Sequence, residues 1–204
     1  IKGDDFFVIK IATGFYDNPK HGKPSSNGVM VVFSSTSGEP VALLKDEGWL
    51  TDMRTGIGGA ITTIKLAPKS ARNVLLIGTG LQCRFQADCL SRLNPNIYQY
   101  SVWGRSFENA EKACEELSAK GLEIKPVTDL EEGVKKADVI ITTTPSTEHI
   151  VRNSWVSAST HITAIGADSL GKRELDIDLL HRADLLVSDL NSQSLDHGEF
   201  QRIK

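Results

Sequence analysis

The spacing of apolar residues changes near residue 70 of the chain. Before that point, short apolar runs bounded by glycine, proline, serine and asparagine predict β-strands at residues 6–11, 29–33 and 41–44. Residues 36–39, Thr-Ser-Gly-Glu, lie between the last two runs and predict a hairpin turn. Residues 49–66 have helical spacing but contain Gly56, Gly58 and Gly59, which disfavour an isolated helix. These glycines indicate either a helix packed tightly on a sheet or backbone close to a ligand.

From residue 73 onward, strand-like and helix-like segments alternate. The predicted strands cover residues 73–78, 99–104, 122–127, 137–143, 161–166 and 184–188. The predicted helices cover residues 81–94, 107–120, 130–136 and 175–182. This alternation predicts a parallel sheet with right-handed crossovers, as in the dinucleotide-binding Rossmann fold. We therefore expect an α/β protein, with a Rossmann-type domain at residues 70–204 and part of an α+β, substrate-binding domain at residues 1–69.

The composition is that of an ordinary globular protein, with 204 residues, 40% hydrophobic, 24% charged and a net charge of −3. This charge balance argues against a nucleic acid or a membrane surface as the main partner. The three cysteines lack C-x-x-C spacing and the five histidines are scattered, so we expect no metal site, and reduced thiols in the cytoplasm. The start, which is neither a signal peptide nor a methionine, and the helix-like end suggest an internal piece of a longer chain.

A glycine-rich turn follows the first strand of the second region, with the sequence Gly78-Thr79-Gly80-Leu81-Gln82-Cys83. The first glycine allows a tight strand-to-helix turn, and the second lets the backbone approach a pyrophosphate at the helix N-terminus. The third motif position usually holds glycine or alanine, and Cys83 is small enough to fit but larger than usual. The motif alone is weak evidence, and the alternating elements around it turn it into a prediction of dinucleotide binding.

The end of the second strand bears on which dinucleotide binds. NAD-binding folds place Asp or Glu about 20 residues after the glycines, to hold the ribose 2′-hydroxyl. Here the sequence is Gly104-Arg105-Ser106, and no acid is present. Arg105 and Ser106 offer a guanidinium and a hydroxyl to a 2′-phosphate, and Gly104 leaves room. We therefore favour NADP(H) over NAD(H), the alternative being that Arg105 is a solvated loop charge beside a permissive adenosine site.

Two further loops follow strands and should lie where ligands bind in such sheets, beyond the carboxyl ends of the strands. In the first, after the fourth strand, hydroxyl groups and a proline could form a floor under the nicotinamide ring. The second, residues 165–172, holds Asp168 between two glycines, where its carboxylate can project into the cleft. The alternative for Asp168 is that it caps the next helix. The residues expected to bind the cofactor are Gly78, Thr79, Gly80, Leu81, Gln82, Gly104, Arg105, Ser106, Thr143, Thr144, Pro145, Ser146 and Gly166.

Two cations in the first region are candidates for binding a carboxylate substrate. Lys10 is the only charged residue in its apolar run, and Arg54 lies in the glycine-bearing helix. The alternative is that both are solvated surface charges.

Several short motifs, taken together and in order, resemble the ornithine cyclodeaminase/mu-crystallin family over nearly the whole chain. They are Lys10-Ile-Ala-Thr-Gly-Phe-Tyr-Asp-Asn-Pro19, Pro24-Ser-Ser-Asn-Gly28, Gly38-Glu-Pro-Val-Ala-Leu-Leu44, Leu50-Thr-Asp-Met-Arg-Thr55, Gly78-Thr-Gly80, Val102-Trp-Gly-Arg105 and Ala164-Ile-Gly-Ala-Asp168. The chain is most similar to the ectoine-utilisation and ketimine-reductase-like branch. Cys83 departs from the alanine that is usual in this family.

The resemblance implies roles for four residues. Lys10 would contact the substrate and take part in catalysis, Arg54 would bind its carboxylate, Asp168 would transfer the proton, and Lys172 would border the same site. It also implies a homodimer through the first domain, and terminal portions that complete the site and that these 204 residues lack.

The reaction that the resemblance implies is hydride transfer between nicotinamide and the α-carbon of a small amino or imino acid. It could run as cyclodeamination or as reduction of a cyclic imine or ketimine. A second possibility is a non-catalytic, mu-crystallin-like protein that binds NADPH and a small ligand. A third, a shikimate-dehydrogenase-like enzyme, is contradicted by the hairpin predicted at residues 29–44.

Overall fold

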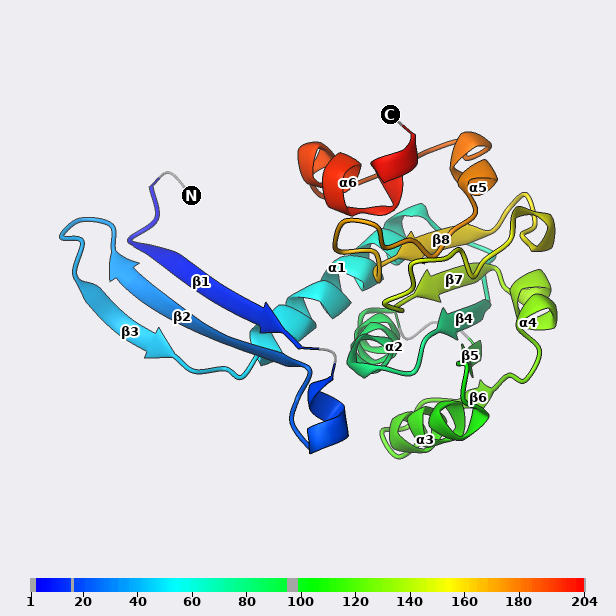
Figure 1. Cartoon of the computed structure of the whole chain (residues 1–204), viewed down its shortest axis with the longest axis horizontal. Helices are drawn as coiled ribbons and strands as arrows, with labels where there is room; N and C mark the ends of the chain where they lie inside the picture. The colour runs from blue at the N-terminus through cyan, green and yellow to red at the C-terminus, as the bar shows by residue number, and fades with distance from the viewer. Residues whose placement is uncertain (1–2, 16, 95–98, 204) are drawn as a thin grey trace. The chain divides into compact units, whose positions relative to one another are not determined.

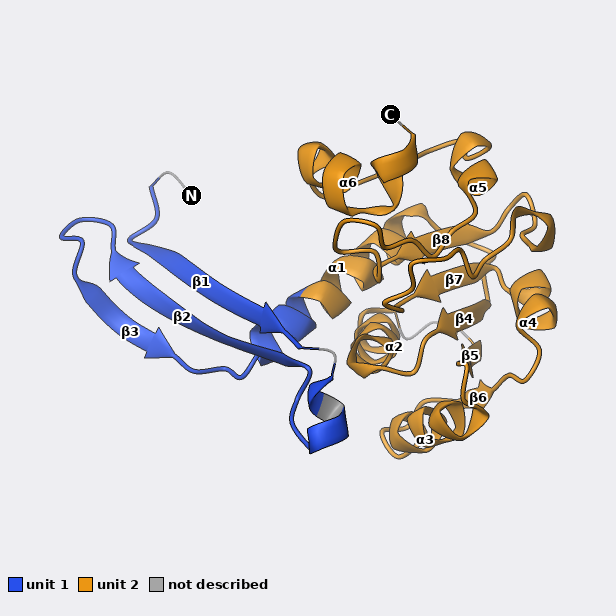
Figure 2. Cartoon of the chain, in the orientation of Figure 1, with its two compact units in different colours: residues 1–54 blue, residues 55–204 orange. Residues whose placement is uncertain are grey.

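The computed structural model describes residues 3–15, 17–94 and 99–203, so Tyr16 of the first motif lies outside the described residues. The chain divides into two compact units, residues 1–54 and 55–204 (Figure 2). The division falls inside helix α1 (Trp49–Leu66). Each unit is described by itself below.

Unit 1 is a three-stranded antiparallel sheet of β1 (Phe6–Gly14), β2 (Ser26–Ser34) and β3 (Pro40–Leu44), in that order. The 3₁₀ turn η1 (Asn18–His21) lies between β1 and β2. The hairpin predicted between β2 and β3 is confirmed: Gly38 has a φ of 74°, and its N–H donates to the carbonyl of Ser34 at 2.9 Å. The left-handed backbone at this point favours glycine.

Both faces of this sheet are largely apolar, and they differ in one charged side chain. Residues directly opposite each other on antiparallel strands share a face. One face, the apolar face, has no charged residue among these pairs and comprises Phe7, Ile9, Ile11, Val29, Val31, Phe33 and Leu43, with Thr13 and Asn27 at one end. The rings of Phe7 and Phe33 stack there, with centroids 5.1 Å apart. The opposite face carries Lys10, which pairs with Met30, and is otherwise mostly apolar, with Val8 and Val32.

Two glycines of helix α1 lie where the helix packs closely against its neighbour. A Cβ on Gly59 would lie 2.1 Å from Oε1 of Gln86, and one on Gly56 would lie 3.0 Å from Sγ of Cys89, both on helix α2 (Leu81–Leu93). The alternative of a tightly packed helix therefore holds at these two positions. At Gly58 a Cβ would meet nothing within 4 Å.

Unit 2 contains a five-stranded parallel sheet, which confirms the predicted Rossmann-type fold (Figure 1). Its strands, in the order they lie in the sheet, are β6 (Ile124–Pro126), β5 (Gln99–Trp103), β4 (Asn73–Ile77), β7 (Val139–Thr142) and β8 (His161–Ala164). The central strands are buried on both sides, as covered parallel strands require. The order of the strands reverses between β4 and β7, which is where ligands bind in sheets of this kind.

The connecting helices cover the two faces of the sheet. Helices α2 and α3 (Phe107–Ser118) lie on one face and α4 (Leu130–Lys136) on the other (Figure 1). The apolar core on the α4 side includes Leu75, Ile77 and Val134. Helix α5 (Ile177–His181), helix α6 (Asn191–His197) and the 3₁₀ turn η3 (Glu199–Arg202) follow β8.

The sixth strand predicted at residues 184–188 is wrong, because the structure has a loop there. The apolar side chains of this run stay exposed, Leu185 at 65% and Val187 at 52%. A run of leucine and valine raises strand propensity, but a strand exists only where a neighbouring edge pairs with it.

Candidate functional site

The glycine turn after β4 requires glycine at its first position. Gly78 has a φ of 119°, and a Cβ there would lie 2.5 Å from Oγ1 of Thr143. Its N–H donates to the carbonyl of Trp103 at 2.8 Å, and the N–H of Thr143 donates to the carbonyl of Ile77 at 2.9 Å. The turn is thus tied to the ends of both neighbouring strands, β5 and β7.

The N-terminus of helix α2 is open to an anion. Gly80 is its N-cap, and no side chain caps the helix there. A Cβ on Gly80 would meet nothing within 4 Å, so the space beside the Gly80 Cα is open. Because the first N–H groups of a helix lack intrahelical partners and carry a partial positive charge, this geometry fits a pyrophosphate.

Cys83, at the third motif position, is a packing residue. Its side chain is fully buried, and burial raises the pKa of its thiol to about 12. A thiol with so high a pKa is protonated and inert at neutral pH. All three cysteines are buried and free of disulfides.

Arg84 stabilises the glycine turn by hydrogen bonds to its backbone, a role that the motif did not indicate. Its Nη1 donates to the carbonyls of Thr79 at 2.7 Å and Gly80 at 3.1 Å, and its Nε pairs with Glu116 of α3 at 2.6 Å. The hydrogen bond from Arg84 holds the pKa of Glu116 below its usual range. The only hint in the sequence was that Arg84 directly follows the glycine motif. An arginine that binds the turn and one that is solvated look the same in sequence.

The segment after β5 combines packing with surface charge. A Cβ on Gly104 would lie 2.4 Å from the methyl group of Thr79, so Thr79 fills the space that this glycine leaves. Arg105 is exposed. Ser106 is the N-cap of α3, and its hydroxyl accepts the N–H of Asn109 at 3.3 Å. That hydroxyl still has its own proton to donate.

The loop after β7 is held by hydrogen bonds from its own side chains. Thr143 Oγ1 donates to the carbonyl of Ile77 at 3.2 Å, and Ser146 Oγ donates to the carbonyl of Glu148 at 2.6 Å. Pro145 is exposed between them. This loop therefore lies next to the glycine turn, as expected for the carboxyl ends of adjacent strands.

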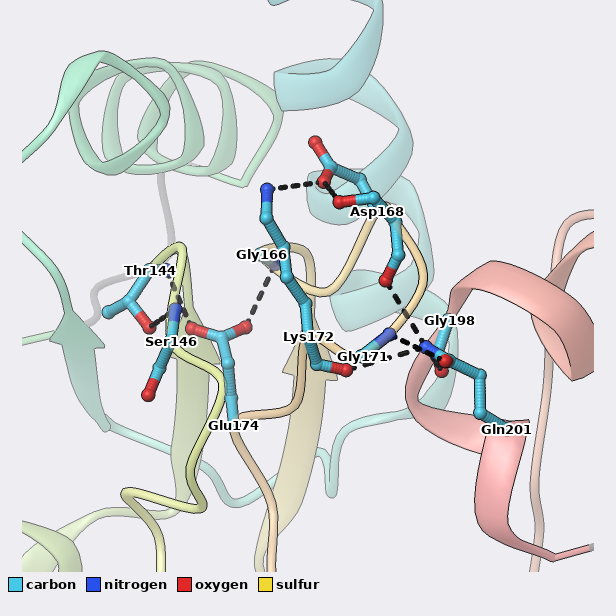
Figure 3. Close-up of polar contacts among 10 residues, drawn as sticks. Thr144, Ser146, Gly166, Asp168, Gly171, Lys172, Glu174, Gly198 and Gln201 are labelled. Carbon is cyan, nitrogen blue, oxygen red and sulfur yellow. Dashed lines mark hydrogen bonds and ion pairs between the residues drawn. The ribbon is translucent and has the colours of Figure 1, made fainter. Parts of the chain in front are cut away.

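The loop after β8 brings Asp168 and Lys172 together (Figure 3). Nζ of Lys172 lies 2.6 Å from Oδ1 of Asp168, and Ser169 Oγ donates to the same oxygen at 3.1 Å. The Lys172 side chain is only 10% exposed, whereas that of Asp168 is 59% exposed. In this ion pair the Asp168 carboxylate is exposed to solvent, whereas the Lys172 side chain is largely buried.

The alternative that Asp168 caps the next helix is excluded. Helix α5 begins at Ile177, and its N-cap is Asp176, whose carboxylate accepts the N–H of Asp178. Asp168 lies outside that cap and remains a candidate for chemistry.

Glu174 is a second residue that sequence reasoning missed. Its side chain is fully buried, and its carboxylate accepts hydrogen bonds from the N–H groups of Thr144 and Gly166 (Figure 3). It also accepts the hydroxyl of Thr142. Burial raises the pKa of Glu174, although these hydrogen bonds act in the opposite direction. In sequence, the run Lys-Arg-Glu-Leu reads as a charged surface segment, so no signal separated this glutamate from an exposed one.

The turn η3 folds back onto the same loop. Glu199 accepts the N–H groups of Glu174 at 2.6 Å and Leu175 at 3.3 Å. Gln201 accepts the N–H of Gly171 at 3.0 Å and donates to the carbonyl of Ser169 at 3.3 Å. Burial, together with the neighbouring Glu174 charge, raises the pKa of Glu199 to about 7.

The two candidate substrate-binding cations of unit 1, Lys10 and Arg54, are both on its surface. Lys10 is exposed on β1 and Arg54 is exposed on α1. The structure groups Asp168 and Lys172 within unit 2, and the roles of Lys10 and Arg54 stay predictions.

The described part of the chain contains no cluster of three or more His, Cys, Asp or Glu that could hold a metal ion. Among the same residues, no helix is both long and apolar enough to span a membrane.

Comparison with known proteins agrees with this geometry. A protein of Sinorhizobium fredii named as an uncharacterized cyclodeaminase is 40% identical over 200 residues, covering 98% of this chain and 60% of that protein. The structure of Thermococcus litoralis Δ1-pyrroline-2-carboxylate reductase in complex with NADH and L-proline has a TM-score of 0.87 and 32% identity, covering 95% of this chain and 60% of that one. A lysine cyclodeaminase structure, concerning recognition of L-lysine, L-ornithine and L-2,4-diaminobutyric acid, has a TM-score of 0.89 and 30% identity, covering 98% of this chain and 58% of that one.

The chain spans about 60% of the length of these relatives. It matches the sequence model of one family over residues 2–204, and it has a glycine turn, a Rossmann-type sheet and an Asp–Lys pair at the end of β8. The chain therefore belongs to the ornithine cyclodeaminase/mu-crystallin family.

Proposed function

We propose that this protein is an enzyme that uses a nicotinamide dinucleotide to exchange a hydride with the α-carbon of a small amino or imino acid. The reaction would reduce a cyclic imine or ketimine, or cyclodeaminate a diamino acid. The observation that carries the proposal is the outward-facing Asp168 carboxylate on buried Lys172. Its loop follows β8, at the same edge of the parallel sheet as the glycine turn after β4.

The residues of the glycine turn fit a dinucleotide. The uncapped N-terminus of α2 and the open space at Gly80 would hold the pyrophosphate, and the loop from Thr143 to Ser146 would lie under the nicotinamide ring. When bound, the nicotinamide supplies or accepts the hydride. Because Arg105 is exposed and no acid follows β5, we propose NADP(H) as the preferred form.

The protein's own groups would bind the substrate and move a proton. We propose that Arg54 and Lys10 bind the substrate carboxylate and that Lys10 also takes part in catalysis. Asp168 would give a proton to the substrate nitrogen during reduction and remove one during amine oxidation. The Lys172 ammonium, 2.6 Å away, would hold the Asp168 carboxylate in one orientation.

We propose that the protein acts as a homodimer in the cytoplasm. The apolar face of the unit 1 sheet carries several half-exposed side chains, among them Phe7, Ile9 and Ile11. Exposed apolar surfaces of this kind mark association sites, and a second copy offers a matching surface.

The test mixes the full-length protein with NADPH or NADH and a panel of cyclic imino acids, and follows the absorbance of the reduced nicotinamide. Ammonia release from ornithine, lysine or diaminobutyrate is measured in parallel. Turnover in either assay supports the proposal. Tight nucleotide binding without any turnover would instead favour a mu-crystallin-like binding protein.

A further inference from the structure

Glu174 connects strands β7 and β8 at the point where their direct pairing ends. The ladder between β7 and β8 closes with the pair Thr142 and Ala164, followed by a hydrogen bond from the N–H of Ile165 to the carbonyl of Thr142 at 2.9 Å. Beyond that point the N–H groups of Thr144 and Gly166 both donate to Glu174. The carboxylate therefore continues the connection where direct strand pairing stops.

The two oxygens of Glu174 have different partners. Oε1 accepts the N–H of Thr144 at 2.6 Å. Oε2 accepts the N–H of Gly166 at 2.9 Å and the hydroxyl of Thr142 at 2.7 Å. A carboxylate can accept on both sides, whereas an amide has an acceptor on one side only. Glutamine at this position would point its NH₂ group at a backbone N–H in either orientation.

The fit around this carboxylate is tight. A Cβ on Gly166 would lie 2.2 Å from the carbonyl oxygen of Thr144 and 2.6 Å from Oε2 of Glu174. Only glycine lets the two loops approach each other this closely. The Glu174 carboxylate lies between Thr144 and Gly166 (Figure 3).

Burying a carboxylate in this way is energetically unfavourable for a contact that only fills space. The desolvation cost of the carboxylate is large, and none of the described ion pairs includes Glu174. The hydrogen bonds that it accepts offset this cost. An apolar side chain of similar volume could fill the space without that cost, but it could not hold the two N–H groups in place.

We propose that Glu174 is a positioning residue, which fixes the loop under the nicotinamide ring (Thr143 to Ser146) relative to the loop that carries Asp168. This inference rests on the proposed function. Hydride transfer and proton transfer act on adjacent atoms of one substrate, so the spacing of these loops sets the alignment of both steps. Glu174 would therefore affect mainly the chemical step, whereas the N-terminus of α2, to which none of its hydrogen bonds runs, would hold the pyrophosphate.

The experiment compares Glu174→Gln with the matched control Glu115→Gln, an exposed glutamate of α3. Turnover is expressed per folded molecule, with the folded fraction taken from circular dichroism. We expect kcat to fall about 100-fold in Glu174→Gln, since misplacement by about 1 Å has that effect. The nucleotide Kd should change much less than kcat, because none of the hydrogen bonds of Glu174 runs to the glycine turn. A deuterium isotope effect from 4-deuterated nicotinamide should increase, because the hydride step becomes rate-limiting.

A milder pair of variants keeps the test valid if Glu174→Gln folds poorly. Thr142→Val removes one donor to Glu174 with little change of shape, and Thr142→Ser retains the hydroxyl. We expect a reduced kcat in Thr142→Val and rescue in Thr142→Ser. Hydrogen exchange of the Thr144 and Gly166 amides, measured without substrate, should be faster in Glu174→Gln than in Glu115→Gln.

The outcomes separate this inference from the proposed function. An active wild-type protein, with a normal kcat per folded molecule in Glu174→Gln, would overturn the role of Glu174 and leave the proposed function standing. Unchanged hydrogen exchange at the Thr144 and Gly166 amides in Glu174→Gln would show that Glu174 does not hold the two loops together, whatever the activity. A wild-type protein without turnover would overturn the proposed function, and with it the positioning role of Glu174.

Discussion

At the scale of single residues, Asp168 combines exposure with a fixed orientation. Its carboxylate faces outward while Lys172 and Ser169 hold one of its oxygens. Asp168→Asn keeps the shape and can still accept these hydrogen bonds, but it cannot exchange a proton at neutral pH. We expect kcat to fall by about 10²–10⁴-fold, as for loss of a general acid or base, and the nucleotide Kd to stay unchanged. Asp178→Asn, at an exposed position of α5, is the control; turnover near the wild-type level in Asp168→Asn would exclude Asp168 as the proton-transfer group.

Arg105 tests the choice of nucleotide. Its exposed guanidinium follows β5, where the 2′-phosphate of NADP(H) would lie. Because a charged hydrogen bond is worth about 1.5–3 kcal/mol, we expect Arg105→Ala to raise the Kd for NADPH by about tenfold or more. The Kd for NADH should not change. Arg92→Ala, which removes an exposed arginine paired with Asp88 on α2, is the control. An equal loss of both nucleotides in titrations would show that Arg105 does not read the 2′-phosphate.

At the scale of elements, the turn η3 gives the Asp168 loop a pH-dependent support. The pKa of Glu199 is raised to about 7 from the ordinary 4.5, so between these values the unfolded chain loses a proton that the folded chain keeps. The contribution of Glu199 to stability is therefore complete below the lower value and is lost as the pH rises through about 7.

The variant Glu199→Gln removes this titration. We expect the free energy of unfolding of the wild type to fall between about pH 5 and pH 8 by on the order of 1 kcal/mol more than that of Glu199→Gln. Urea unfolding at a series of pH values measures the difference. Glu115→Gln should follow the wild type. Parallel curves for the wild type and Glu199→Gln would show that Glu199 titrates normally.

At the scale of the whole molecule, the apolar face of the unit 1 sheet tests the proposed homodimer. A glutamate in place of Ile9 would bury a charge in the contact, which is strongly unfavourable without a partner. We expect Ile9→Glu to be monomeric by light scattering at concentrations where the wild type is dimeric. Ala42→Glu, on the opposite face, should remain dimeric. A monomeric wild type would overturn the proposed homodimer, and a dimeric Ile9→Glu would place its contact elsewhere.

Much of the fold followed from local pattern. The hairpin at Gly38 and the strands and helices of the Rossmann-type sheet were predictable because turn residues and the periods of strands and helices are properties of neighbouring positions. The strand at residues 184–188 failed for the complementary reason, since pairing with a neighbouring edge is not a local property.

The candidate site divides in the same way. The sequence by itself determined the glycine turn, where Gly78 has a positive φ and Gly80 leaves open space, and it indicated the segment that holds Asp168. Only the tertiary structure decided that Arg84 supports this turn, that Asp176 rather than Asp168 caps α5, and that Glu174 is buried between two strand ends. The physical reason is that a charged residue has the same local sequence whether water or distant backbone groups solvate it. Its burial and its partners exist only once the strands have come together.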